Sequence, residues 1–244
     1  MYIETTHSTN TLLHELITKG EWPQDEHFLR AGYQTAGRGQ TGNGWESEKG
    51  KNLLCSILLP PRKELFELNV AVAVAVQRTV GEAFTIKWPN DIYWQDQKVA
   101  GILIENAIMG NEIKYSIAGI GINVNQTEWH SDAPNPVSLK QITGQTYDLD
   151  AIMQQLMREV QKALTQDLWA YYKAHLYRRE GFWPFVEREV NTTPTMNAKD
   201  DANAFLARIA DVLPTGEILL EDQQGRQHKY HFKQIRFVIK QNIN

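Results

Sequence analysis

The sequence predicts an α+β fold, with a mixed sheet and its helices in residues 1–188 and a small β-barrel in residues 189–244. Two observations support this prediction. In the first part, several strand-type apolar runs follow one another, and only a few stretches have the 3.6-residue period of a helix. In the second part, short strand-type runs are separated by turn signals such as Pro214-Thr215-Gly216.

The composition is that of a soluble globular protein. Of the 244 residues, 42% are apolar and 22% are charged, which argues against disorder. The net charge of −4 gives no whole-chain signal for nucleic acid or an anionic membrane. The one cysteine, Cys55, lies in an apolar run and is expected to be a buried, inert thiol. We see no signal peptide and no apolar run near the roughly 20 residues that span a bilayer, so we expect a cytoplasmic protein.

The first part begins with a short strand and a helix whose ends are both marked in the sequence. Ser8-Thr9-Asn10 precedes apolar residues at helical spacing, and Gly20 follows them as a stop. Further helices are expected at 65–80, which is rich in Ala and Val, at 151–164 and at 168–177. Strands are expected at 2–4, 28–33, 52–59, 85–88, 92–95, 99–107 and 113–124.

The pattern changes after residue 188. Asn191-Thr192-Thr193-Pro194 is a break, and four short strands are expected beyond it, at 205–212, 217–221, 228–232 and 235–239. About 50 residues of this kind fit a small β-barrel. We therefore place a domain boundary near residue 188.

Residues 35–50 contain five glycines and no hydrophobic period, which predicts a long exposed loop of the kind that is often functional. Within it, Gly37-Arg38-Gly39-Gln40-Thr41-Gly42 matches the Gly-x-Gly-x-x-Gly pattern of dinucleotide sites. No amphipathic helix follows, so we exclude a dinucleotide site. The glycines still allow backbone N–H groups to approach an anion, and Arg38 adds a forked cation. A flexible surface loop is the alternative.

Two later segments place charged residues at strand ends. Lys87-Trp88-Pro89-Asn90-Asp91 is either a plain connection between strands or a site where Lys87 meets a phosphate and Asp91 lies near a metal ion or water. Lys98 precedes an apolar run, and a solvated strand end is the alternative to a functional cation there.

Glycines inside two strands indicate close approach by a ligand or another segment. Gly101 lies within the strand expected at 99–107, and Gly119 and Gly121 repeat at a period of two in the strand expected at 113–124. Residues two apart share one face of a strand, so Gly119 and Gly121 leave a slot in which an apolar ligand can lie.

Taken together, these segments resemble the biotin–protein ligase family. The residues that carry the resemblance are, in order, Thr9-Asn10, Gln34 with Gly37-Arg38-Gly39, Lys87-Trp88-Pro89-Asn90-Asp91, Lys98 with Ala100-Gly101-Ile102-Leu103-Ile104-Glu105, and Gly119-x-Gly121-x-Asn123. Each motif alone is weakly or moderately specific, but five in this order and spacing are strongly specific. The likeness to the family's catalytic domain covers roughly residues 1–180, and the C-terminal barrel is similar to the family's Src-homology-3-like domain.

The resemblance implies a ligase that uses biotin, ATP and Mg²⁺. Members of the family form biotinyl-5′-adenylate with release of pyrophosphate. They then transfer biotin to a lysine of the biotin carboxyl carrier protein of acetyl-CoA carboxylase or a related carboxylase. Lys98 and Arg38 match the family's catalytic cations. A carboxylate that attacks a phosphate needs such positive charge beside it. Residues 35–50 match a loop that closes over the adenylate, and we expect that loop to be mobile until ligands bind.

The resemblance also implies which residues bind the substrates. On the biotin side they are Ser8, Thr9, Asn10, Gln34, Arg38, Gly39, Gln40, Lys98, Gly101, Ile102 and Gly119. On the ATP side they are Arg38, Trp45, Lys87, Asn90, Asp91, Lys98 and Asn123. No fixed protein site for a metal is expected, because Mg²⁺ arrives with ATP and lies near Asp91.

The sequence departs from the family pattern in two places. Many relatives have arginines where this chain has Gln40 and Asn43, which predicts a weaker grip of the loop on the adenylate. Some relatives carry an N-terminal DNA-binding domain, whereas here the pattern begins within ten residues of Met1, so we expect no binding to specific DNA. The alternatives in function are a lipoate or octanoate ligase of the same fold and a non-catalytic biotin-binding sensor. In solution the chain is expected to be a monomer or a homodimer, with no membrane partner.

Overall fold

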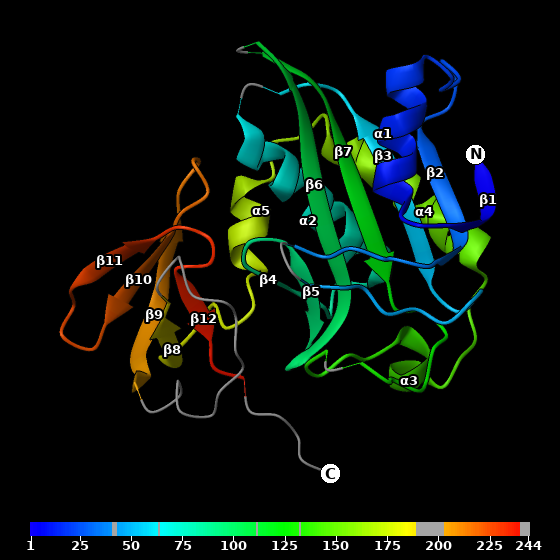
Figure 1. Ribbon diagram of the computed structural model, residues 1–244. Helices are drawn as coiled ribbons and strands as arrows, with labels where there is room; N and C mark the ends of the chain where they lie inside the picture. The colour runs from blue at the N-terminus through cyan, green and yellow to red at the C-terminus, as the bar shows by residue number, and fades with distance from the viewer. Residues whose placement is uncertain (41–42, 63, 111, 132, 189–202, 240–244) are drawn as a thin grey trace.

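The computed structural model describes residues 1–40, 43–62, 64–110, 112–131, 133–188 and 203–239. Within these ranges the chain forms a seven-stranded sheet with helices on both faces and a five-stranded sheet beside it (Figure 1). The predicted α+β class, with a mixed sheet followed by a small β unit, is therefore confirmed.

The large sheet is mostly antiparallel. Its strand order is β1-β2-β3-β7-β6-β5-β4, and among the described strands the edge pair β1–β2 is the parallel one. The strands are β1 (Tyr2–Thr6), β2 (Phe28–Gln34), β3 (Leu53–Leu59), β4 (Thr85–Lys87), β5 (Asp91–Trp94), β6 (Gln97–Met109) and β7 (Glu112–Ile122). The long strands β6 and β7 form a hairpin through the middle of the sheet (Figure 1).

Helices cover the two faces unequally. They are α1 (Thr9–Lys19), α2 (Leu65–Val80), α3 (Leu139–Thr143), α4 (Leu149–Ala163) and α5 (Trp169–Ala174). α2 and α4 pack together against one face, and α1 lies against the other (Figure 1). Successive strand residues point to opposite faces, so Ile102 and Ile120 join the core beneath α2 while Gly101 and Gly121 lie on the α1 face. None of the helices in the described ranges is long and apolar enough to cross a lipid bilayer.

The smaller, C-terminal sheet has five antiparallel strands in the order β11-β10-β9-β8-β12. They are β8 (Trp183–Glu187), β9 (Phe205–Val212), β10 (Ile218–Asp222), β11 (Gln227–Tyr230) and β12 (Ile235–Phe237). The sheet fits a small Src-homology-3-like unit, here called the barrel. Strand β8 was not predicted, and it pairs with both β9 and β12. The domain boundary near residue 188 stays a prediction, and we propose to place it before Trp183. The predicted break at 191–194 lies outside the described residues.

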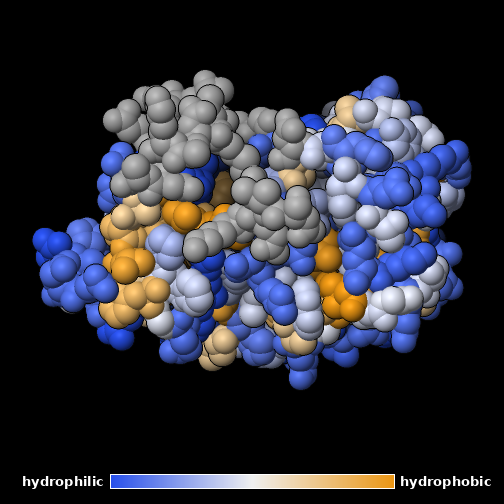
Figure 2. Space-filling view, turned by 90° about the horizontal axis from the view of Figure 1, so that it is seen from below, coloured by the Kyte–Doolittle hydropathy of each residue, from blue (hydrophilic) through white to orange (hydrophobic). Residues whose placement is uncertain are grey.

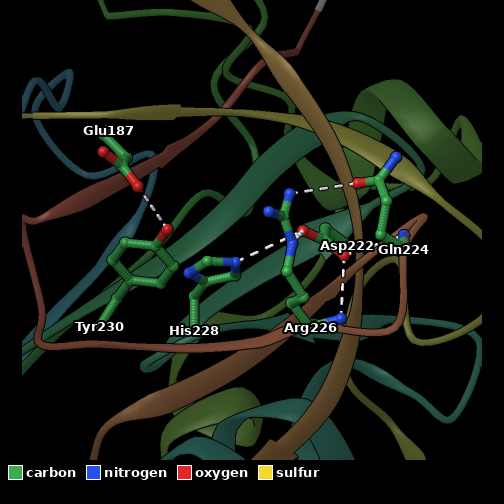
Figure 3. A network of polar contacts seen from close by, with 6 residues as sticks. All are labelled: Glu187, Asp222, Gln224, Arg226, His228 and Tyr230. Carbon is green, nitrogen blue, oxygen red and sulfur yellow. Dashed lines mark hydrogen bonds and ion pairs between the residues drawn. The ribbon is translucent and has the colours of Figure 1, made fainter.

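A polar network closes the β10–β11 hairpin of the barrel (Figure 3). The Asp222 carboxylate accepts hydrogen bonds from the backbone N–H groups of Gln224 and Arg226 and from Arg226 Nε at 2.8 Å. His228 Nε2 lies 3.5 Å from the same carboxylate, and Tyr230 donates to Glu187 at 2.5 Å. A cavity of about 700 Å³ lies over these side chains. The contacts of Asp222 are those of a residue that stabilises a turn.

The barrel contacts the large sheet at Trp88. Trp88 Nε1 donates to the Gly216 carbonyl at 3.1 Å, and the Trp88 ring packs against Phe232. Gly216 has a φ of +101°, and a Cβ there would lie 2.6 Å from the ring of Phe66. Both the backbone conformation and the space therefore require glycine. This contact holds residues 87–91 against the barrel.

Large apolar side chains are exposed on the barrel. Figure 2 shows a mostly hydrophilic face on which apolar side chains gather over the barrel, at the left. The large exposed apolar residues of the barrel and of the segment that leads into it are Phe182, Trp183, Leu206 and Phe232. Most other large apolar side chains of the described residues are buried or partly buried.

Most predicted elements are present, with ends that differ by a few residues. The helix predicted at 168–177 is shorter than expected: α5 ends at Ala174, and Tyr177 then donates its backbone N–H to the Ile86 carbonyl at the edge of the sheet. Helix α3 was missed. It is five residues long and begins with a capping box between Ser138 and Gln141, so it is too short to show a hydrophobic period.

The buried position of Cys55 predicts slow chemical modification. Cys55 lies in β3 at 0% exposure, and burial raises the pKa of its thiol to about 12. The folded protein should therefore react with a thiol reagent such as iodoacetamide at pH 8 at least about 100-fold more slowly than the protein unfolded in guanidinium chloride, because the reactive thiolate is scarce and covered. Mass spectrometry over time measures both rates, and similar rates would show that β3 opens readily.

Candidate active site

Most of the predicted site residues meet on the α1 face of the sheet, along the β6–β7 hairpin, whereas Lys87 and the side chain of Ile102 lie elsewhere. They come from the start of α1, the end of β2, residues 35–50, β4, the β4–β5 connection and the β6–β7 region. We call residues 35–50 the lid loop, and in Figure 1 it passes in front of β6 and β7. Thr41 and Gly42 of its glycine motif lie outside the described residues.

One end of this face carries hydrogen-bonding groups. Ser8 is the N-cap of α1, Thr9 is its first residue, and both are buried. Thr9 donates to Gln34 Oε1 through its backbone N–H at 2.7 Å and through its hydroxyl at 3.1 Å. The Gln34 oxygen is thus fixed, and the Gln34 amide N–H groups have no partner within the described part of the chain. A ligand with a carbonyl oxygen can accept hydrogen bonds from them.

Asn10 is held by the sheet rather than free to meet a ligand. Its Nδ2 donates to Glu105 Oε2 at 2.7 Å and to the Leu103 carbonyl at 3.3 Å, and its Oδ1 accepts from Ser56 Oγ at 2.6 Å. A Cβ at Gly119 would come closer than 3.0 Å to this amide. The glycine predicted to border a ligand therefore makes room for Asn10, and Asn10 in turn orients Glu105.

The slot predicted over Gly119 and Gly121 is only partly open, because Asn10 fills the Gly119 position. The indole of Trp45 lies over Gly121 and over Gly101 of the neighbouring strand, and we call this pair of glycines the glycine slot. Gly101 and Gly121 are partners across β6 and β7. A Cβ on either glycine would lie closer than 3.0 Å to the Trp45 ring. An apolar ligand chain on this face must therefore contact or displace the indole. The resemblance grouped Trp45 with the nucleotide and did not place it over these glycines.

The other end of the face is charged. Lys98 Nζ lies 2.8 Å from Asp91 Oδ1 and 5.8 Å from the centroid of the Trp45 ring. Asn123 donates from Nδ2 to the Lys98 carbonyl at 3.2 Å. Two buried polar atoms here, Asn123 Oδ1 and Trp45 Nε1, have no hydrogen-bond partner among the described residues. A polar ligand bound near Lys98 could form hydrogen bonds with both of these unpaired atoms.

Lys87 lies farther from this centre, between the large sheet and the barrel. Its Nζ lies 5.5 Å from the ring centroid of Tyr93 and 5.0 Å from that of Phe237, which belongs to β12. It makes no ion pair within the described ranges, and burial lowers its pKa to about 8. An anion that reached Lys87 would stabilise its charged form.

Gln40 connects the lid loop to the strand connection at Asn90. Gln40 Nε2 donates to Asn90 Oδ1 at 3.3 Å, and Asn90 Nδ2 donates to Asn69 of α2 at 2.8 Å. The resemblance grouped Gln40 with biotin and Asn90 with ATP, whereas the structure places the two side chains in contact. Gly39 is part of the tight bend of the loop, where its N–H donates to the Asn43 carbonyl.

The described part of the lid loop is anchored at both ends. Arg38 and Gly44 form an isolated antiparallel bridge, and Arg38 Nη2 lies 3.0 Å from Glu105 Oε2. Farther along, Glu46 accepts hydrogen bonds from the backbone N–H groups of His130 and Ser131 at 2.8 and 2.9 Å. Mobility of the loop in the absence of ligand stays a prediction.

Some residues differ in placement from the sequence analysis, and others were missed by it. The side chain of Ile102 is 3% exposed and lies in the core on the opposite face, so only its backbone can reach a ligand here. Glu105 and Ser56 were given no role, although a polar residue inside an apolar strand was the available signal.

A cavity of about 430 Å³ opens beside Glu105, lined among others by Asn10, His14, Glu15, Arg38 and Tyr115.

Comparison with known proteins identifies the family. The sequence model described as the biotin/lipoate A/B protein ligase family matches residues 2–123, which is half of the chain. The chain belongs to this family. All the predicted site residues, from Ser8 to Asn123, lie within the matched stretch.

Similarity to individual ligases extends beyond that stretch. The bifunctional ligase/repressor BirA of Bacillus spizizenii is 28% identical over 246 residues, which cover 94% of this chain and 71% of that protein. The biotin–[acetyl-CoA-carboxylase] ligase of Mycobacterium tuberculosis is 30% identical over 153 residues, 58% of this chain and 55% of that protein. The structure of biotin protein ligase from Aquifex aeolicus in complex with biotin and ATP matches with a TM-score of 0.75 at 22% identity, over 98% of both chains. That likeness shows that the ligase fold includes both sheets.

The glycine slot predicts the effect of one added methyl group. Gly121→Ala should push the Trp45 indole off the sheet, because the new Cβ would come closer than 3.0 Å to the ring. The lid loop would lose its apolar anchor, and we expect trypsin to cleave after Arg38 at least about threefold faster, with a loss of stability of about 1–3 kcal/mol if the ring stays in place. Gly44→Ala is the control, since its Cβ would lie 3.7 Å from the nearest atom. Equal cleavage of both variants would show that Trp45 does not anchor the loop.

Proposed function

We propose that the protein is a biotin–protein ligase, which activates biotin with ATP and transfers it to a lysine of a biotin carboxyl carrier protein. The observation that carries this proposal is the order of groups along one face of the sheet. Gln34, oriented by Thr9, offers amide N–H groups at one end, the slot over Gly101 and Gly121 is apolar, and Lys98 lies at the other end. Biotin has the matching order of a ureido ring, an apolar chain and a carboxylate.

The polar end favours biotin over lipoate or octanoate. Those acids share the apolar chain and the carboxylate but have no ureido group. They would leave the N–H groups of Gln34 without a ligand partner once the lid loop closes over the site. Sites built to hydrogen-bond a substrate discriminate strongly against analogues that lack the bonding group.

In the first step, a carboxylate oxygen of biotin attacks the α-phosphorus of ATP. The bond between that phosphorus and the oxygen that bridges to the β-phosphate breaks, and pyrophosphate leaves. Both reactants are anions, so the cations of Lys98 and Arg38 offset the charge that grows on the phosphoryl oxygens. Asp91 holds the Lys98 ammonium at 2.8 Å. Mg²⁺ would enter as the complex with ATP, near Asp91.

In the second step, the uncharged amine of the acceptor lysine attacks the carbonyl carbon of biotinyl-5′-adenylate. An amide bond forms, the bond from carbonyl carbon to phosphate oxygen breaks, AMP leaves, and the proton that the amine loses passes to the solvent. Water would attack the same carbon, so the lid loop has to cover the adenylate until the acceptor arrives. With Gln40 and Asn43 uncharged, Arg38 is the basic side chain of the loop that is suited to this anion.

The remaining assignments of partners are part of the same proposal. The acceptor is the carrier domain of an acetyl-CoA carboxylase or a related carboxylase, and we propose a cytoplasmic location. The expectation that no specific DNA is bound rests on the net charge of −4 and the lack of a basic stripe in the sequence. A polarisation titration at physiological salt, with DNA from upstream of biotin genes, would test that expectation.

Pyrophosphate release tests the proposed function. With biotin and MgATP but no carrier, we expect one pyrophosphate per site in a burst, followed by slow turnover that accelerates when a biotin-accepting domain is added. Lipoate and octanoate in place of biotin should give little or no burst. A burst with lipoate would identify a lipoate ligase, and biotin binding without pyrophosphate would identify a sensor.

Lys98→Ala tests the charged end of the site. Loss of this cation should slow adenylate formation at least about 100-fold, which corresponds to about 2.7 kcal/mol of transition-state stabilisation. Lys114→Ala is the control, because Lys114 is exposed on β7 and makes no ion pair among the described residues. Rapid-quench measurement gives the rate, and circular dichroism checks that the variant is folded. A near-normal rate in Lys98→Ala would remove Lys98 from the mechanism.

A further inference from the structure

Glu105 is a charged residue of the site that the proposed function leaves without a role. It lies on β6, four residues after Gly101 and therefore on the same face of the sheet. A single oxygen, Oε2, contacts both Asn10 Nδ2 at 2.7 Å and Arg38 Nη2 at 3.0 Å. Glu105 thus joins the first helix to the lid loop.

The two contacts of Glu105 differ in strength. Asn10 is 3% exposed, and its amide is also fixed by Ser56 and by the Leu103 carbonyl, so the bond that it donates holds the carboxylate in one place. The ion pair with Arg38 is half exposed, at 47% for the Arg38 side chain and 40% for that of Glu105. Pairs of this kind change an equilibrium constant by no more than about fivefold. The carboxylate is held firmly and the guanidinium is held weakly.

Arg38 has few other places to pair. It is the basic residue between residues 35 and 48, and Glu105 is its carboxylate partner in the described part of the chain. The bond closes a link between segments 67 residues apart in the sequence. The other cation of the lid loop, Lys49, pairs with Glu4, so a carboxylate that holds Arg38 competes directly with a phosphate for it.

We propose that Glu105 is a positioning residue, which Asn10 orients so that it holds the Arg38 guanidinium beside the site until the phosphate of the nucleotide displaces it. This inference rests on the proposed function, since it names what competes for the lid arginine in that reaction. A phosphate in a water-poor site binds a guanidinium through two strong hydrogen bonds, so it outcompetes a half-exposed carboxylate. Glu105 therefore keeps the lid cation off the site at a small cost in nucleotide affinity.

Glu105→Gln tests the inference, because the new amide oxygen can still accept from Asn10 but carries no charge. At low ionic strength we expect the half-saturating ATP concentration for biotin-dependent pyrophosphate exchange to fall by about two- to fivefold, with the half-saturating biotin concentration unchanged. Raising the salt concentration should shrink the difference, since it screens the exposed pair. In an Arg38→Gln background, the same substitution should leave the ATP dependence unchanged.

A second readout needs no enzyme activity. In the ligand-free protein, trypsin should cleave after Arg38 about two- to fivefold faster in Glu105→Gln than in the unchanged chain, because the guanidinium is no longer held. Glu4→Gln is the matched control: it removes the ion pair between Glu4 and Lys49 of the same loop and should leave cleavage after Arg38 unchanged.

The outcomes separate this inference from the proposed function. The role of Glu105 would be overturned if Glu105→Gln left the half-saturating ATP concentration unaltered or raised it. It would also be overturned if the substitution had an equal effect in the Arg38→Gln background, or if it left cleavage after Arg38 unaltered. Absence of biotin-dependent exchange in the unchanged chain would instead overturn the proposed function, and the cleavage rates would still decide whether Glu105 holds Arg38.

Discussion

The site depends on a lack of side chains at three positions of one sheet face. Gly101, Gly119 and Gly121 leave the backbone of β6 and β7 bare where neighbouring positions carry side chains. Asn10 reaches the sheet only because Gly119 has no Cβ, and Trp45 contacts the other two glycines. The first helix and the lid loop are therefore both positioned by the same hairpin. A substituent on any of these glycines would move a segment that is distant in sequence.

A second consequence of this packing is that the polar groups of the site form two connected sets, one at each end. Ser56 holds Asn10, Asn10 holds Glu105, and Glu105 holds Arg38 of the lid loop. At the opposite end, Asp91 holds Lys98, and Asn123 donates to the Lys98 backbone. Buried members fix the geometry, while the half-exposed pair at Arg38 remains exchangeable. A ligase needs that combination, because it has to orient an anionic substrate and then enclose the adenylate that forms.

The predictions from sequence succeeded where a residue type carries its own local geometry. Glycines at a period of two inside a strand indicated a bare face, and the cluster Ser8-Thr9-Asn10 with Gly20 marked both ends of α1. They failed where a contact joins distant segments. Nothing local to Trp183–Glu187 shows that it is a barrel strand, because it becomes one by pairing with β9 and β12. Likewise, Ile102 belongs to a motif of the site, but strand alternation turns its side chain into the core.

The sequence by itself determined the class of fold through its periodicity, and its motifs resemble those of the family that the comparisons identify. Which residues are candidates for the site is what that resemblance implies. Only the tertiary structure decided what each of those residues touches: that Trp45 fills the glycine slot, that Gln40 meets Asn90, that Lys87 lies under a ring of the barrel, and that Glu105 holds Arg38. The reason is physical. Such contacts depend on how the sheet brings together segments that are tens of residues apart, and that arrangement is set by the packing of the whole chain rather than by any local pattern.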